Sequence, residues 1–251
     1  MATGGVVTER NDMRLLGRVR HVLDEAIATL WPILRSRRFL LLLAAILIVD
    51  AWLAGLDMAY RYAVLNGLKL PSWFDLTQED GFSEDWEYLL TTLATIMMGR
   101  LYFRARAPIF ATAAIIFAWL TLDNFAGIHE WGGALLAPLF GFLHGSNLHP
   151  QDLGELVTFF LIGAVVITGL WRSVRSGHPR ANILGLAVMA CIGLAAGFGV
   201  FVDFAHAAIR GSPLGDQVGS FIEEFGELVS LSLAAALTFS LSPAVKAASD
   251  R

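Results

Sequence analysis

Three short segments of the chain carry carboxylates, two of them with an imidazole as well, at spacings that could hold a metal ion. Residues three, four or seven apart share one face of an α-helix, so Asp123 and Glu130 are expected to share a face. A carboxylate-x-x-His arrangement on bundled helices is one that binds metal pairs. If the segments meet, their carboxylates would be too close to ionise together unless a cation or protons lay between them. The residues are, in chain order, Asp123, His129, Glu130, Asp203, His206, Glu223, Glu224 and Glu227.

These residue types suggest a role for each group. Glu223 is expected to act as a general base, because acidic surroundings should raise its pKa. A mixed set of oxygen and imidazole donors suits zinc or iron, so the predicted cofactor is a divalent metal ion. Three further acids are expected to contact the ligands rather than the metal and so to orient them: Asp50, Glu87 and Glu155. The predicted ligands themselves are Asp123, His129, Glu130, Asp203, His206, Glu224 and Glu227.

The positions of the acids recur along the chain. Asp50, Asp123 and Asp203 each lie near the end of an apolar run, and an acid-x-x-Glu pattern starts three others. Glu87 and Glu155 are 68 residues apart, and the next such glutamate follows after a further 72. This spacing predicts a degenerate threefold repeat of helical hairpins. Capping of helix N-termini is the alternative explanation for the glutamates, but it does not account for the three aspartates.

Composition indicates which elements position these residues. The chain has 251 residues, of which 56% are hydrophobic and 16% charged, with a mean hydropathy of +0.61. A soluble domain carries about a quarter charged residues. Six apolar runs are long enough to cross a bilayer as helices, so an all-α polytopic membrane protein is expected. The runs span 38–56, 86–103, 107–126, 153–171, 182–204 and 218–240, which gives hairpins of about 38–103, 107–171 and 182–240.

The charge distribution predicts the orientation of these spans. All but three of the 18 basic residues fall on one side, the exceptions being Arg61, Lys69 and Arg210. The positive-inside rule then places both termini in the cytoplasm and the acids at the outer face of a plasma membrane. Since the basic residues act as topology signals, nucleic-acid binding is not expected. Arg61 follows Asp57 by four residues, which predicts an ion pair on one helix face.

Two segments outside the spans are amphipathic or apolar. Within the cytoplasmic tail 1–37, residues 12–35 show helical periodicity and are expected to lie on the membrane surface, ahead of a transmembrane domain over 38–251. Residues 131–143 are apolar and rich in glycine but too short to span, so they are expected to lie over the outer face. Either segment could dock a protein partner.

Three functions remain open on these grounds. The preferred hypothesis is a metal-dependent membrane enzyme, a hydrolase or an oxidoreductase, that acts on a lipid-soluble or outer-face substrate among the membrane lipids. A proton or divalent-cation transporter is the first alternative, although few polar residues apart from Thr91, Thr92 and Ser240 appear in the inner half of the spans. The second alternative is a non-catalytic subunit or assembly factor of a membrane complex.

Overall fold

The computed structural model describes residues 5–78, 81–143, 149–202, 204–206 and 213–241. The described part consists of helices joined by short turns and contains no strand, so the expectation of an all-α protein is confirmed. Four helical segments are long and apolar enough to cross a membrane, which indicates a membrane protein. They are α2 (Arg37–Leu65), α4 (Pro108–Ala126), α6 (Pro150–Ser176) and the segment that begins with α7 (Pro179–Ala196).

Two further long helices, α3 (Phe82–Ala105) and α9 (Pro213–Ser240), run alongside these four. They are 24 and 28 residues long but do not have the sustained apolar character of the other four. Helix α9 holds three glutamates within residues 223–227, and α3 holds Glu84, Asp85 and Glu87 in its first two turns. These two helices therefore bring many of the acids into the bundle.

Local sequence signals explain where the helices begin and end. The Oγ of Ser36 accepts a hydrogen bond from the backbone N–H of Phe39 at 3.1 Å and so caps α2. Helices α4, α6 and α7 begin with proline, whose missing N–H is not needed in the first turn. Gly127 has a φ of +55°, a left-handed conformation that ends α4. A π-helical turn, η3 (Gly197–Val202), follows α7.

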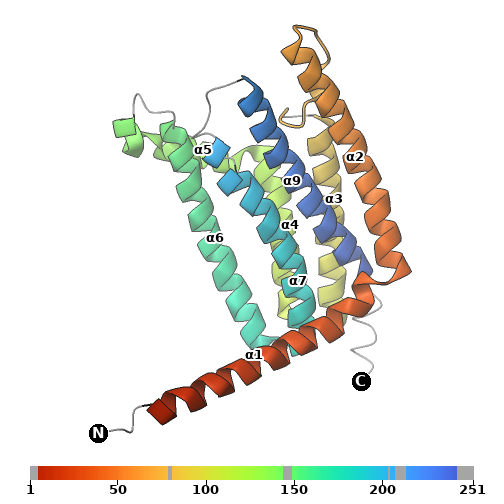
Figure 1. Ribbon diagram of the computed structural model, residues 1–251, viewed down its shortest axis with the longest axis vertical. Coiled ribbons are helices and arrows are strands. Elements are labelled where there is room, and N and C mark those ends of the chain that lie inside the picture. The colour runs from red at the N-terminus through yellow and green to blue at the C-terminus, as the bar shows by residue number, and fades with distance from the viewer. Residues whose placement is uncertain (1–4, 79–80, 144–148, 203, 207–212, 242–251) are drawn as a thin grey trace.

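Helix α9 lies at the centre of the packing, where it contacts α2, α3 and α7. The main neighbour of α3 is α4, and the fully buried side chains of Met98, Phe110, Phe117 and Leu184 form the core between these helices. In contrast, α6 stands at one edge of the bundle and packs on α4 and on the short helix α5 (Ile128–Leu136) (Figure 1). The glutamates of α9 are consequently surrounded by residues from three helices.

The two ends of the bundle are covered by different elements. Helix α1 (Gly5–Leu34) runs across the end at which α2, α4 and α7 begin (Figure 1). The opposite end carries α5, the 3-10 helix η1 (Ser72–Phe74) and the 3-10 helix η2 (Ala137–Leu143). The described acidic residues among those singled out in the sequence lie toward this second end, which we call the acidic end.

Candidate functional site

Carboxylates from three helices come together inside the acidic end. Glu87 of α3 lies within electrostatic range of Glu224 and Glu227 of α9 and of Asp50 of α2. Asp50 is fully buried, and the three glutamates are half-buried. We call these four residues the acid cluster. Like charges in such a setting repel one another strongly, so the arrangement favours a cation or protons among them.

Glu227 touches the π-helical turn of the chain. A Cβ atom on Gly199 would lie 2.5 Å from Oε2 of Glu227, and one on Gly226 would lie 2.3 Å from a ring carbon of Phe198. Glycine at both positions therefore lets η3 pack directly against α9. Single π-helical turns are found frequently at functional sites, and this one forms a wall of the acid cluster.

Asp123 and His129 form a second group. Oδ1 of Asp123 accepts a hydrogen bond from the backbone N–H of His129 at 3.0 Å, and Oδ2 lies 3.2 Å from Nδ1 of the same residue. The expectation that Asp123 and Glu130 share a face of one continuous helix was wrong, because Gly127 ends α4 and α5 begins at the next residue. The reversal turns His129 back onto Asp123 and leaves Glu130 exposed.

The surroundings of His129 favour its protonated form. Its ring stacks on Phe159 of α6, with centroids 5.0 Å apart. Burial lowers the pKa of His129. The hydrogen bond and charge of Asp123, together with the charges of Glu130 and Glu155, raise this pKa by more than burial lowers it, so that it lies above the ordinary value. Glu227 is within electrostatic range of both His129 and Asp123, which connects this pair to the acid cluster.

A third group surrounds His206. This buried imidazole has its Nε2 3.1 Å from Oδ1 of Asp216 and its Nδ1 3.6 Å from Oε2 of Glu223. Asp216 was missed in the sequence, although its spacing of seven residues from Glu223 places both on one face of α9. Asp203, which was expected beside His206, lies outside the described residues.

The carboxylate of Asp50 faces side chains of α3 and α9. Nε1 of Trp86 donates a hydrogen bond to Oδ1 of Asp50 at 2.9 Å. The other carboxylate oxygen, Oδ2, and the hydroxyl of Ser232 have no well-formed hydrogen bond among the described residues. Ser232 is nevertheless close enough to influence the Asp50 carboxylate. One buried oxygen of Asp50 is therefore left without a full partner, which is costly in a bundle interior.

Glu155 lies at the junction of α5 and α6. Its Oε1 accepts a hydrogen bond from Nε2 of Gln151 at 2.8 Å, and a Cβ on Gly133 would collide with its Cγ at 2.2 Å. A narrow crevice separates this part of α6 from η3, lined by Asp152, Glu155, Leu156, Phe159, Gly199, Val200 and Phe204. Glu155 thus belongs to the outer boundary of the site rather than to the acid cluster.

The structure therefore distributes the predicted residues over neighbouring groups. Among the described residues, no three His, Cys, Asp or Glu side chains stand close enough together to hold a metal ion as they are placed. Glu87, which was expected to orient the ligands rather than to contact the metal, lies within electrostatic range of the acids of α9 and of Asp50. The link from the acid cluster to Asp123 and His129 runs through Glu227.

One comparison with known proteins identifies a family. The family described as Domain of unknown function (DUF8692) matches residues 86–241, which include all the described site residues except Asp50. No curated protein and no solved structure matches the chain. Because the match covers more than half of the sequence and extends from α3 to α9, the protein belongs to the DUF8692 family.

Proposed function

We propose that the protein is a plasma-membrane protein with six transmembrane helices, in which α3 and α9 complete the set. Both helices run beside the four apolar ones, and α9 contacts α2, α3 and α7. The proposed orientation puts both termini in the cytoplasm, the acidic end outside and α1 on the inner membrane surface, in agreement with the clustering of basic residues. The three helical hairpins of the sequence would then be α2 with α3, α4 with α6, and α7 with α9.

The proposed function is binding of a divalent metal ion, zinc or iron, at the acidic end. The observation that carries it is the acid cluster, in which Glu87 and Glu224 lie in electrostatic range of Glu227, and Glu227 in range of Asp123 and His129. Such a group is stabilised by a cation. The described side chains would have to draw together on binding, since no three of them stand at ligand distance.

The proposed ligands are three of the seven expected from the sequence. Glu224 and Glu227 would supply carboxylate oxygens and His129 an imidazole, a donor set that zinc and iron both accept. Glu223 would act as general base toward a lipid-soluble or outer-face substrate, because it lies beside His206 at the same end. A bound metal would supply Lewis acidity or redox chemistry there.

Transport of protons or divalent cations is a second candidate, and one observation favours it. The hydroxyls of Ser232 and Thr238, on the inner half of α9, are fully buried and have no hydrogen-bond partner among the described residues. The sequence had indicated a nearly apolar inner half. These hydroxyls supply polar atoms along the helix that carries the glutamates, as a path across the membrane requires.

Metal content of the detergent-purified protein, prepared gently and without chelator, tests the first proposal. We expect about one or two equivalents of zinc or iron in the wild type and their loss in Glu224→Gln/Glu227→Gln. Gly199→Ala is the second variant, because its Cβ would push aside Oε2 of Glu227 although the substitution removes none of the proposed ligand residues. Asp24→Asn, at an exposed carboxylate of α1, is the control.

The outcomes separate the two candidates. Absence of metal from wild type and variants alike would reject the metal site. Proton or divalent-cation uptake into proteoliposomes, diminished by Ser232→Ala, would then support transport. Uptake that is absent from the wild type as well would reject the second candidate.

A further inference from the structure

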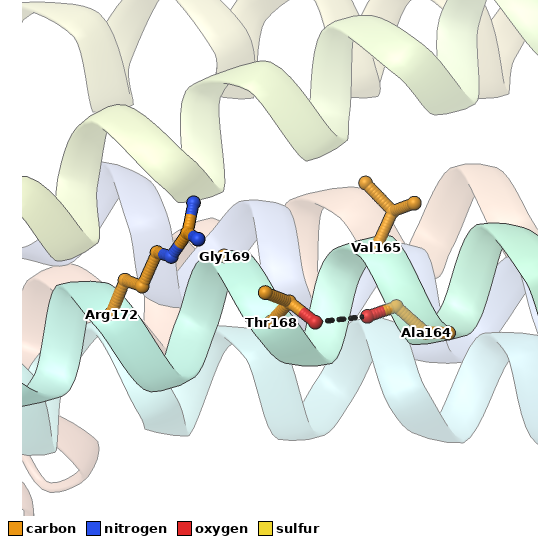
Figure 2. Close-up of a pocket in the computed structure, with 5 residues that line it drawn as sticks. All are labelled: Ala164, Val165, Thr168, Gly169 and Arg172. Carbon is orange, nitrogen blue, oxygen red and sulfur yellow. Dashed lines mark hydrogen bonds between the residues drawn. The ribbon is translucent and has the colours of Figure 1, made fainter.

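The exposed side of α6 carries a feature that the acidic end does not use. Only 6% of the most apolar stretch of α6 is buried, against 28–33% for the other three apolar segments. A groove of about 390 Å³ lies on this helix, lined by Ala164, Val165, Thr168, Gly169 and Arg172 (Figure 2). It runs toward the end of α6 that we infer to be cytoplasmic.

The groove is apolar over most of its length. The hydroxyl of Thr168 donates a hydrogen bond to the carbonyl oxygen of Ala164 at 2.7 Å, so its polar atom is satisfied by its own helix (Figure 2). Gly169 keeps the groove open toward α4, where a Cβ would meet only a methyl carbon of Thr112 at 3.6 Å. Such a surface suits a hydrocarbon chain.

The cytoplasmic end of the groove is basic. The side chain of Arg172 points to the same side of α6 as Val165 (Figure 2). Its backbone carbonyl accepts a hydrogen bond from the hydroxyl of Ser176, but its guanidinium makes no hydrogen bond or ion pair among the described residues. One turn further on, the guanidinium of Arg175 lies 4.3 Å from the ring centre of Trp171, an exposed side chain of the kind found at membrane interfaces. Two guanidinium groups therefore stand where a lipid phosphate would lie.

This basic end is held in place by its neighbours. Oγ1 of Thr112 on α4 and Oγ of the buried Ser173 lie 2.6 Å apart. Nδ2 of Asn182 on α7 donates to the carbonyl oxygen of Val174 at 2.8 Å. Because α6 is tied to α4 and α7 beside Arg172, the groove and its basic end keep a fixed relation to each other.

We propose that this groove binds one anionic phospholipid, with an acyl chain along Val165 and Gly169 and the phosphate at Arg172. Charge complementarity favours this occupant over a partner helix, since the cytoplasmic leaflet carries the anionic lipids. The site is separate from the acid cluster and does not depend on metal binding.

Native mass spectrometry of the delipidated full chain with phosphatidylglycerol or phosphatidylcholine tests the proposal. We expect one retained phosphatidylglycerol, and an affinity reduced about fivefold by Arg172→Gln, the effect of one basic group near the headgroups. Gly169→Leu should lower the affinity by filling the groove. The matched controls are Arg100→Gln, an exposed arginine of α3, and Gly163→Leu, a glycine of α6 outside the groove with open space around it.

Three results would overturn the proposal. The first is equal loss of lipid in Arg172→Gln and Arg100→Gln, and the second is equal binding of phosphatidylcholine. The third is a photo-crosslinker at position 168 that captures a polypeptide instead of a lipid in membranes, which would assign the groove to a partner helix. Metal content serves as an independent readout and should not change in any of these variants.

Discussion

Two groups of acids at the acidic end differ in how their charge is balanced. Asp57 is fully buried, but Nε of Arg61 donates to its Oδ2 at 2.5 Å and the backbone N–H of Leu76 donates to its Oδ1 at 2.9 Å. The main charged neighbours of Glu87 are, instead, further acids: Glu227, Glu224, Glu84 and Asp50. A cation thus balances the charge of Asp57 directly, whereas the charged neighbours of Glu87 are acids. Within the acid cluster, only Glu224 and Glu227 lie within electrostatic range of a described basic side chain, Arg61 and His129 respectively.

The first group, the Asp57–Arg61 clamp, joins three parts of the chain. Nη1 of Arg61 also donates to the carbonyl oxygen of Gln217 on α9 at 2.8 Å, and Nη2 lies 3.6 Å from Asp75 after η1. The predicted Asp57–Arg61 ion pair is confirmed. Nε and Nη1 of Arg61 are hydrogen-bonded, whereas the buried Nη2 makes only the longer contact to Asp75. The contacts to α9 and to the segment after η1 indicate a structural role, because removal of one partner would leave the other charge buried and unpaired.

The largest effect is expected from breaking the clamp. Arg61→Met leaves Asp57 buried without its counter-ion and should destabilise the protein by about 3–5 kcal/mol. Thermal unfolding in detergent would show this as a large drop in Tm, whereas Arg100→Met should have little effect. The double variant Asp57→Leu/Arg61→Met should recover part of the loss. An unchanged Tm in the single variant would contradict the structural role of the clamp.

Within the acid cluster, Asp50 is the member whose carboxylate accepts a hydrogen bond from a neutral donor, the indole N–H of Trp86. Trp86→Phe removes the hydrogen bond to Oδ1 while keeping an aromatic ring, and should cost about 1–3 kcal/mol. The comparison is Trp52→Phe, an exposed tryptophan of α2. Equal Tm values for the two variants would show that the indole N–H contributes nothing to holding Asp50.

Removing one charge from the acid cluster should raise the stability of the protein, whereas the two substitutions above should lower it. In chelator, Glu87→Gln relieves repulsion with Glu224 and Glu227 and should stabilise the protein by about 1 kcal/mol, the scale of two charges close together in a well-solvated setting. Asp24→Asn should leave Tm unchanged. If Glu87→Gln instead destabilises the metal-free protein, the cluster is structural like the clamp.

The smallest expected effect concerns pH. Since the pKa of His129 is raised in the fold, its contribution to stability is fully present below the unfolded pKa of about 6.5 and is lost as pH rises through the folded value. Metal-free wild type should therefore lose stability above pH about 6.5 more steeply than His129→Gln. The exposed His21→Gln should behave like the wild type. Parallel pH profiles for all three proteins would exclude this contribution.

Much of the site could be read from residue types and spacing. The i, i+4 spacing was sufficient for the Asp57–Arg61 pair, because both residues lie on one uninterrupted helix. The same reasoning failed for Asp123 and Glu130, since one left-handed glycine between them changes the direction of the chain. Asp216 was overlooked because its partner, His206, precedes it across a connection that spacing rules do not describe.

The helices, and the end of the bundle at which the acids gather, follow from the order of residues along the chain. Apolar runs of membrane-spanning length and clustered basic residues depend on local composition, which needs no knowledge of packing. Which acids become neighbours depends instead on how the helices pack. Glu87 and Glu227 are 140 residues apart, and they meet because α9 packs against α3 and α2 at the centre of the bundle. Helix packing is set by the shapes of many side chains together, so no single spacing along the chain encodes it.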